Sequence, residues 1–229
     1  MKRIVGYILI LVILSGIAYA LYVFVPRVPT LSTGPAPAAT STEVTVQEKV
    51  ITESTDAYKI DAHYPQFGIV SVDEKVQAAV EKALTEFRAY PQNPRDSATP
   101  QNELVSSYNS VYIGSDVASI ALSISEYTGG AHGNTVVIGV NVDRATGKEI
   151  SLDDALGLIG KTLPQVAEAS LVQLRATLGG DLTFPEGASA TAENYGTFLV
   201  SEDRVTFVFN NYQVAPYAAG QQHVWFARK

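Results

Sequence analysis

Residues 127–134 combine residue types that an ordinary connection between strands does not need. The segment reads Tyr-Thr-Gly-Gly-Ala-His-Gly-Asn, so that three glycines surround His132. Glycine residues let the backbone adopt positive φ angles or approach a second molecule closely. An imidazole in such a loop can contact a ligand, bind a metal ion or take part in proton transfer. It can equally fix the turn by hydrogen bonding to a nearby backbone carbonyl group.

Two of these roles for His132 are disfavoured by the residues available to support it. The chain has three histidines, no cysteine and no H-x-H or H-x-x-E-H pattern, so we predict no metal site. General acid–base catalysis needs an acid or a nucleophile positioned beside the imidazole. Ser125, Glu126 and Asp143 are candidates, but no motif places them there. We therefore predict neither catalytic residues nor a cofactor, and the structural and ligand-contact roles both stay open.

A second group of candidates lies near the C-terminus, where the chain reads Tyr-Gln-Val-Ala-Pro-Tyr-Ala-Ala-Gly from Tyr212 to Gly220. Pro216 and Gly220 are turn-forming residues. The tyrosines either pack over a sheet edge or form an aromatic patch for a sugar chain or a protein. Loops on a rigid sheet commonly carry binding residues. The predicted ligand- or partner-binding residues are Tyr127, Gly129, Gly130, His132, Tyr212 and Tyr217.

The segment after the third predicted strand is interpreted as a turn and not as a site. We assign Asn141, Asp143 and Gly147 to one β-turn, in which Gly147 takes the position with positive φ. Asp143 and Asp154 carry carboxylates that suit Ca²⁺, but no D-x-D-x-D loop surrounds them. No calcium site is predicted.

Strand patterns dominate the chain after residue 43. Apolar and polar residues alternate in five segments, which predicts half-buried strands. These segments are residues 58–64, 118–124, 136–142, 205–209 and 223–227. Weaker strand patterns cover residues 44–51 and 108–113. The loop around His132 joins two of the strands, so the simplest arrangement there is an antiparallel pair.

Two segments have the apolar periodicity and the end signals of helices. The first starts with a capping box of Ser71 and Glu74 and stops before a proline. The second starts with a capping box of Thr162 and Gln165 and ends at paired glycines. A short helical turn is expected near residues 153–156. The order of elements predicts an α+β fold, an antiparallel sheet with two main packed helices behind an N-terminal transmembrane helix.

An apolar run precedes this domain. Residues 4–25 contain no charged side chain, and about 20 such residues span a bilayer as a helix. Lys2 and Arg3 stand before the run, which predicts that the rest of the chain lies outside the cytoplasm. Residues 18–20 read Ala-Tyr-Ala and resemble a signal-peptide cleavage site, but the apolar run continues beyond them. We therefore favour an uncleaved, single-pass anchor in the cell membrane.

The remaining organisation is a stub at residues 1–3, a linker at 26–42 and an extracytoplasmic domain at 43–229. The linker is rich in Pro, Ser, Thr and Ala, as is typical of a stiff spacer. Only two of the 16 basic residues precede the anchor, so 14 basic and 23 acidic residues follow it, a net charge of −9. This balance argues against nucleic acid as a partner and permits a basic protein partner. Without cysteine the chain forms no disulfides.

Several motifs stand in the order found in a known family. They are residues 127–133, 141–143, 146–148, 151–154, 207–209 and 212–220. In this order they resemble the DUF3298 family of extracytoplasmic bacterial domains. The earlier Tyr-Pro-Gln-Phe at 64–67 and the helix after it resemble the module named after the peptidoglycan deacetylase PdaC (DUF4163). The two parts of the domain would then be residues 43–125 and 126–229.

The resemblance implies a role at the bacterial cell envelope. The family includes the ectodomain of the lysozyme-sensing anti-sigma factor RsiV and the non-catalytic N-terminal part of cell-wall deacetylases. Three features depart from those relatives: only residues 1–3 precede the anchor, no deacetylase domain follows, and Ala155-Leu156 replaces the family's usual Phe after the acidic turn. We therefore expect a membrane-anchored binding or sensory module and not an enzyme.

The expected partner is a lysozyme-like protein or a peptidoglycan fragment. An envelope hydrolase or deacetylase that acts through the His132 loop is the alternative, and a purely structural envelope protein is a third possibility. The three classes differ in what the His132 loop must do. Binding requires that the loop and the tyrosines converge on one exposed surface.

Overall fold

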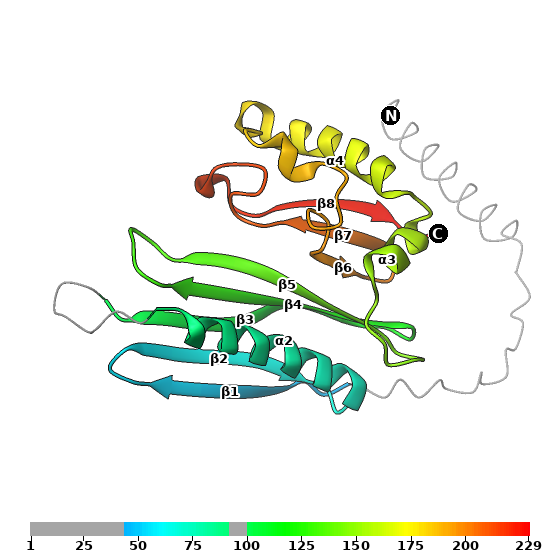
Figure 1. Ribbon diagram of the computed structural model, residues 1–229. Coiled ribbons are helices and arrows are strands. Elements are labelled where there is room, and N and C mark those ends of the chain that lie inside the picture. Colours follow the sequence, from blue (N-terminus) through cyan, green and yellow to red (C-terminus); the bar gives the residue numbers. More distant parts are fainter. Residues whose placement is uncertain (1–43, 92–99) are drawn as a thin grey trace, which may run out of the picture. The chain divides into compact units, whose positions relative to one another are not determined.

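The computed structural model of the protein describes residues 44–91 and 100–229 (Figure 1). These residues contain a five-stranded sheet, a three-stranded sheet and three α-helices, which confirms the α+β class. The predicted anchor at 4–25 and the linker at 26–42 lie outside the described residues. Among the helices that are described, none is both long enough and apolar enough to cross a membrane.

The larger sheet contains five strands that lie across it in chain order. They are β1 (Gln47–Ser54), β2 (Tyr58–Gln66), β3 (Asn102–Ile113), β4 (Val117–Tyr127) and β5 (Asn134–Asp143). The two weaker strand patterns correspond to β1 and to the second half of β3. The antiparallel pair predicted around His132 is confirmed, because β4 and β5 pair antiparallel with Glu126 opposite Asn134.

The prediction of a wholly antiparallel sheet is wrong at one place. β2 and β3 are parallel neighbours, with Tyr58 opposite Asn102. Between these strands the chain forms α2 (Val70–Ala89) and crosses over the sheet before β3 begins. Parallel neighbours require such a crossover, because a tight turn joins only antiparallel strands.

The helix α2 covers one face of the larger sheet. Its predicted apolar stripe is buried there. The stripe consists of Val72, Val76, Val80, Leu84 and Phe87. The capping box predicted at Ser71 is not formed, because the helix begins one residue earlier, at Val70, with Ile69 as its N-cap. The carboxylate of Asp73 instead accepts a hydrogen bond from the backbone N–H of Phe67 at 2.7 Å, which fixes the turn into the helix.

The C-terminal elements form a second, separate sheet. Its antiparallel strands are β6 (Phe198–Val200), β7 (Arg204–Phe209) and β8 (Gln222–Ala227), and its helices are α3 (Leu152–Ile159) and α4 (Leu163–Leu178). The expected helical turn is thus a full short helix, which starts with a capping box of Ser151 and Asp154. The capping box predicted for α4, Thr162 with Gln165, is confirmed.

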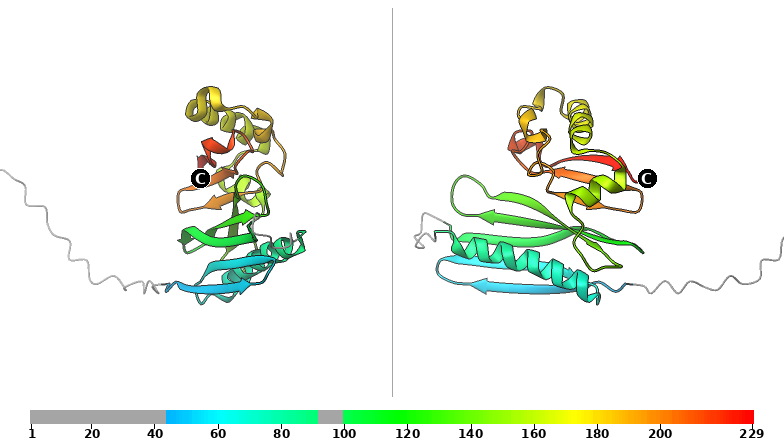
Figure 2. Two further views of the ribbon diagram at one scale, coloured as in Figure 1. Left: turned by 90° about the vertical axis from the view of Figure 1, so that its left-hand side faces the viewer. Right: turned by 45° about the vertical axis from the view of Figure 1, so that its right-hand side comes forward.

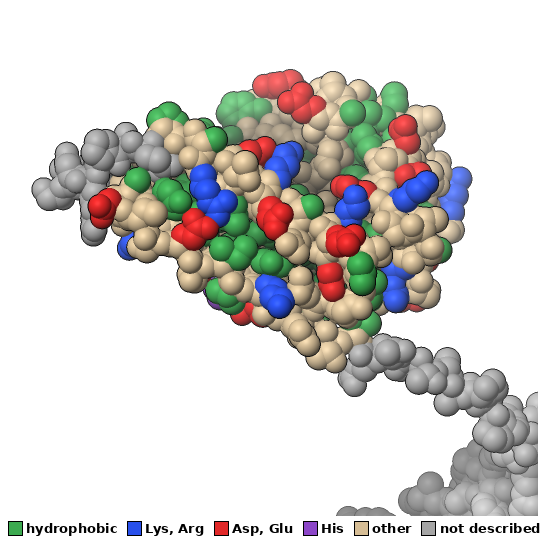
Figure 3. All heavy atoms as spheres, turned by 60° about the horizontal axis from the view of Figure 1, so that its bottom comes forward, with side chains coloured by type: hydrophobic (Ala, Val, Ile, Leu, Met, Phe, Trp, Pro, Cys, Tyr) green, Lys and Arg blue, Asp and Glu red, His purple; other side chains and the backbone are tan. Residues whose placement is uncertain are grey.

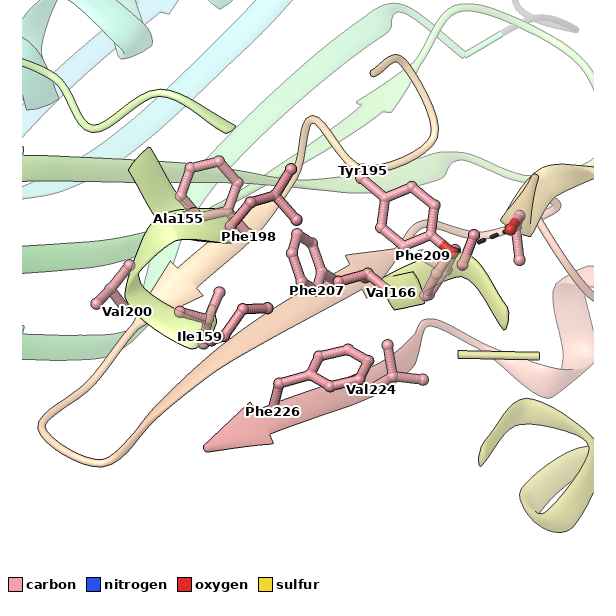
Figure 4. Close-up of a cluster of buried hydrophobic side chains, with 14 of the residues drawn as sticks. Ala155, Ile159, Val166, Tyr195, Phe198, Val200, Phe207, Phe209, Val224 and Phe226 are labelled. Carbon is pink, nitrogen blue, oxygen red and sulfur yellow. Dashed lines mark hydrogen bonds between the residues drawn. The ribbon is translucent and has the colours of Figure 1, made fainter. Parts of the chain in front are cut away.

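Aromatic rings fill the core between this sheet and its helices (Figure 4). The ring of Tyr195 meets Phe207 and Phe209 edge-on, with ring centroids 5.2 and 5.5 Å apart. Phe207 contacts Phe226 in the same way at 6.0 Å. The buried hydroxyl of Tyr195 donates a hydrogen bond to the carbonyl oxygen of Ala188 at 2.9 Å, so its burial leaves no polar group unsatisfied.

The side chain of Gln173 covers the edge strand β8 of the smaller sheet. The carboxamide of Gln173, on α4, donates to the carbonyl oxygen of Trp225 at 3.2 Å and accepts from the N–H of the same residue at 3.3 Å. The pair of hydrogen bonds takes the place of a neighbouring strand. Such cover protects an exposed sheet edge from pairing with another chain.

The smaller sheet packs on the face of β4 and β5 opposite to α2 (Figure 2). The residue that joins the sheets is Asn141, whose side chain is 2% exposed. Its amide donates to the carbonyl oxygen of Phe198 at 2.8 Å, and its oxygen accepts from the hydroxyl of Ser119 at 2.6 Å and from the N–H of Val200 at 3.2 Å. Assigning Asn141 to the turn was therefore wrong, because it lies within β5.

The close approach of the two sheets requires a glycine. A Cβ atom added at Gly139 would overlap the carbonyl oxygen of Phe198. The turn after β5 has the predicted form, with Gly147 at φ 69° and the carboxylate of Asp143 accepting from the N–H of Thr146 at 2.7 Å. Only the role of Asn141 differs from the expectation.

We predict that Asn141→Ala lowers the free energy of unfolding by about 3 kcal/mol, because it removes three hydrogen bonds and leaves buried partners unsatisfied. Ser119→Ala, which removes one partner, should cost less. Equilibrium urea denaturation measures both. The exposed Asn109→Ala is the control and should stay within about 0.5 kcal/mol of the parent. A similarly small effect of Asn141→Ala would show that the contact contributes little to stability.

Candidate functional site

The His132 loop is a tight connection whose shape depends on its glycines. Gly129 and Gly130 have φ angles of 104° and 99°, which L-residues rarely adopt. A Cβ atom at Gly133 would lie 2.9 Å from the carbonyl oxygen of Glu126. The hydroxyl of Tyr127 donates to the carbonyl oxygen of Gly130 at 3.2 Å and ties the two sides of the loop together. The loop therefore holds its central residues in a defined conformation.

The structure brings three predicted residues from two distant segments into contact. The ring of His132 stacks on that of Tyr217, with centroids 4.3 Å apart and planes inclined by 29°. Tyr212 lies beside Tyr217, with ring centroids 5.5 Å apart. The hydroxyl of Tyr212 is 3.3 Å from Nε2 of His132, so each ring contacts the other two. We call His132, Tyr212 and Tyr217 the aromatic cluster.

The hydrogen bonds of His132 select one tautomer of its neutral ring. Nδ1 lies 2.8 Å from the carbonyl oxygen of Gly133, which can only accept, so Nδ1 carries the proton. In the neutral ring Nε2 is then an acceptor and receives the hydroxyl of Tyr212. The backbone contact expected from a structural histidine is present. The ring is nevertheless exposed, and its contact with two tyrosines places it on a surface available to a ligand.

Tyr212 combines exposure with an unusual backbone conformation. Its side chain is 51% exposed, and its φ of 66° is the only positive value at a non-glycine residue in the described part of the chain. The turn is held from both ends, because Gln213 donates its N–H to the carbonyl oxygen of Asn210 and its side chain accepts the N–H of Asn210, both at 3.0 Å. Strained positions of this kind are concentrated at binding and catalytic sites.

The carboxamide of Asn210 fastens this turn to the larger sheet. It accepts from the N–H of Val137 at 2.7 Å and donates to the carbonyl oxygen of the same residue at 3.3 Å. Asn211 adds a hydrogen bond to the carbonyl oxygen of Thr135 at 3.3 Å. These contacts place the two tyrosines over the start of β5, next to the His132 loop.

A hollow of about 560 Å³ lies beside the aromatic cluster. Tyr127, Gly130 and Tyr217 line it together with side chains of β3, β4 and β5. In its wall the hydroxyls of Ser125 and Thr135 are 2.7 Å apart and hydrogen bond to each other. Apolar rings and hydroxyl groups therefore face the same space, as is common in ligand sites.

Glu126 also lines this hollow, and burial raises the pKa of its carboxyl group, with a smaller contribution from the negative charge of Glu86. The carboxyl group gains its proton more readily than an exposed glutamate. It makes no ion pair in the described residues and is not a hydrogen-bond partner of His132. Glu126 thus belongs to the wall of the hollow and not to a catalytic pair with the histidine.

Of the six predicted residues, five contribute to this region and Gly129 only shapes the loop. No group of three or more His, Asp or Glu side chains arranged to hold a metal ion occurs within residues 44–91 and 100–229. The prediction missed Asn210, which positions the cluster, and Thr135 in the wall of the hollow. Asn210 follows a strand directly, which is a turn signal, but its pairing with β5 depends on tertiary contacts.

We predict that Tyr212→Gly leaves the free energy of unfolding unchanged or raises it by up to about 1 kcal/mol, because glycine adopts a positive φ without strain. Thermal and urea unfolding of the variant test this. Tyr217→Gly is the matched control, and we expect it to destabilise, because this position has no positive φ to relieve. A loss of more than about 1 kcal/mol in Tyr212→Gly would mean that the ring stabilises the turn.

Comparison with known proteins identifies two family regions. Residues 51–135 match the family model described as deacetylase PdaC, and residues 160–229 match DUF3298, a family of unknown function. A Bacillus subtilis relative, peptidoglycan-N-acetylmuramic acid deacetylase PdaC, is 26% identical over 166 residues, which are 71% of this chain and 36% of the relative. The chain thus spans about a third of that protein's length.

Two further comparisons extend this result. The immunogenic protein MPT64 of Mycobacterium tuberculosis is 26% identical over 177 residues, 76% of this chain and 77% of the relative. A crystal structure of a DUF3298 family member from Bacteroides fragilis superposes with a TM-score of 0.54 at 16% identity, covering 80% of this chain and 91% of that one, so the fold is shared. The chain is therefore similar to PdaC over residues 51–135 and to DUF3298 over residues 160–229.

Proposed function

We propose that this protein is an envelope-associated binding module, and that its ligand contacts the aromatic cluster and the adjoining hollow. The observation that carries the proposal is the contact of His132 with Tyr212 and Tyr217 on an exposed surface. The strained backbone of Tyr212 costs free energy, and its side chain regains little of it by packing because it is 51% exposed. Packing alone therefore does not account for the cluster. A ligand that covers the rings would explain why they are exposed.

A glycan fragment related to peptidoglycan is the ligand class that suits the site best. Sugar rings present apolar faces to aromatic side chains and hydroxyl groups to polar ones, and the hollow offers both. One relative of the chain is named as a peptidoglycan-N-acetylmuramic acid deacetylase, and the residues that match the PdaC family model include the His132 loop. These facts support peptidoglycan as the source of the ligand.

A lysozyme-like protein is the second candidate partner. Its support is the net charge of −9 that follows the apolar run, because a cationic protein would associate with such a surface in a salt-dependent way. Charges of both signs are interspersed on the face shown in Figure 3, so that face has no single-sign patch to select a docking position. The glycan proposal has the more specific structural support, namely the aromatic cluster and the hydroxyl groups of the adjoining hollow.

We propose binding and not catalysis as the role of His132. Its two ring nitrogens already interact with the carbonyl oxygen of Gly133 and the hydroxyl of Tyr212. A general base needs a free nitrogen within reach of the proton that it removes. In this arrangement the imidazole orients Tyr212 and supplies a stacking surface.

We predict that Tyr217→Ala and His132→Ala each weaken glycan binding about tenfold or more, since they remove a ring from the contact surface. Titration calorimetry of the full-length chain in detergent, with a peptidoglycan-derived hexasaccharide and separately with lysozyme, measures the effect. Lysozyme binding should fall as the salt concentration rises. The melting temperatures of both variants should stay close to that of the parent.

The exposed Tyr90, at the end of α2, provides the matched control, and Tyr90→Ala should bind like the parent. Failure of the parent to bind either ligand at millimolar concentration would refute the proposal. If Tyr217→Ala instead loses several kcal/mol of stability, the cluster is a structural element.

We also propose that residues 4–25 hold the module at the outer face of the cell membrane. The uncharged run and the two preceding cations support an uncleaved anchor. Mass spectrometry of the protein extracted from membranes should therefore find the N-terminal residues retained. A mature N-terminus at Leu21 would show cleavage after residue 20 and contradict this prediction.

A further inference from the structure

We infer that the hollow beside the aromatic cluster is one end of a trough along β3 and β4, and that a linear glycan of several sugars occupies its whole length. The inference rests on the proposed function and extends it. A second subsite lies around His223, Tyr112 and Arg204. A disaccharide bound in the first hollow is too short to reach it. The register of the strands, the spacing of their side chains and a second hollow support this second subsite.

The second hollow has a volume of about 500 Å³. Its lining comes from β3, including Ser110 and Tyr112, from Ala121 of β4, and from Thr206 and His223 of the smaller sheet. It therefore lies between the two sheets, whereas the first hollow opens next to the His132 loop. Both hollows share β3, β4 and β5 as walls.

The register of the strands places the two hollows in line. Side chains alternate between the faces of a strand, so residues two apart point to the same face. On β5 the first hollow includes Thr135 and the second Val137, which are neighbours on one face. On β4 they include Ser125 and Ala121, and Ser123 is the single same-face residue between them.

On β3 and β4, the row that separates the hollows consists of small side chains. Ser123 pairs directly with Ser107 of β3. Ser107 is exposed and Ser123 is partly exposed, so no bulky group interrupts the floor at this row. Since Ala121 and Tyr127 are six residues apart on β4, the floor extends for about 20 Å. This length suits a chain of several sugars.

The second hollow repeats the chemistry of the first. Tyr112 and His223 supply rings, while serine, threonine and glutamine side chains supply hydrogen-bonding groups. Partial burial lowers the pKa of His223 and so favours its neutral ring, which can both donate and accept. Arg204 also lines the hollow, and its guanidinium carbon lies 4.7 Å from the ring centroid of Trp225, which is 52% exposed.

A sugar chain fits this floor better than an extended peptide. Peptides that bind to sheets usually add as a further strand and pair with free backbone groups at an edge. Of the floor strands, β4 is paired on both sides, and β3 is paired with β4 along its length and with β2 at Asn102–Ser106. A ligand on their face therefore meets side chains only, here mainly hydroxyls and rings.

The test compares β-1,4-linked N-acetylated oligosaccharides of two, four and six sugars, titrated into the full-length chain in detergent. We expect the hexasaccharide to bind about tenfold or more tightly than the disaccharide, because it engages both subsites at once. Ser107→Trp places an indole on the connecting row and should reduce hexasaccharide affinity to the disaccharide level, with disaccharide affinity unchanged. Ser107→Ala, which keeps the row open, should bind like the parent.

Two further variants test the second subsite even if Ser107→Trp does not fold. His223→Ala should weaken only the binding of the longer chains. Ala176→Trp adds an indole to the exposed surface of α4, which lines neither hollow, and should change nothing. Melting temperatures report whether each variant is folded.

The outcomes separate this inference from the proposed function. Equal affinities for two and six sugars, together with an effect of Tyr217→Ala, would retain the binding site and overturn the trough. No binding of any oligosaccharide would overturn both. Length-dependent binding of a free stem peptide in place of the sugars would also overturn the trough as a glycan site.

Discussion

The buried contact of Asn141 with the smaller sheet is the interaction on which the arrangement of the domain depends. One carboxamide engages a hydroxyl of its own sheet and two backbone groups of the other. In a water-excluded interface each of these groups would be costly without its partner, so the contact specifies one relative position of the sheets. Gly139 permits that position because it has no side chain where Phe198 approaches. Apolar packing around Val208 supplements this polar contact.

The binding region depends on this placement. Once the sheets are fixed, the turn after β7 lies against the first half of β5, where Asn210 pairs with Val137 as a strand would. Tyr212 and Tyr217 then contact His132. The strain at Tyr212 is sustained by this framework, since the turn is anchored at both ends. Rigid support and a strained exposed residue are the usual combination at binding sites.

Local patterns predicted the elements better than their assembly. Alternation and capping residues located most strands and both main helices, because these signals act within a few residues. The parallel pairing of β2 and β3 and the division into two sheets depend on contacts between distant segments. Asn141 shows the limit best: next to a turn it resembles a turn residue, and only the approach of Phe198 reveals its role. The six candidate site residues came from residue type and sequence position, whereas Asn210 was visible only through its partner in β5.

The aromatic cluster is assembled from both family regions. His132 belongs to the part that matches PdaC, whereas Tyr212 and Tyr217 belong to the part that matches DUF3298. Neither part contains the cluster alone. A substitution that displaces a ring in one part would therefore disturb the rings that the other part supplies. Separating the two regions would part His132 from both tyrosines and remove the cluster.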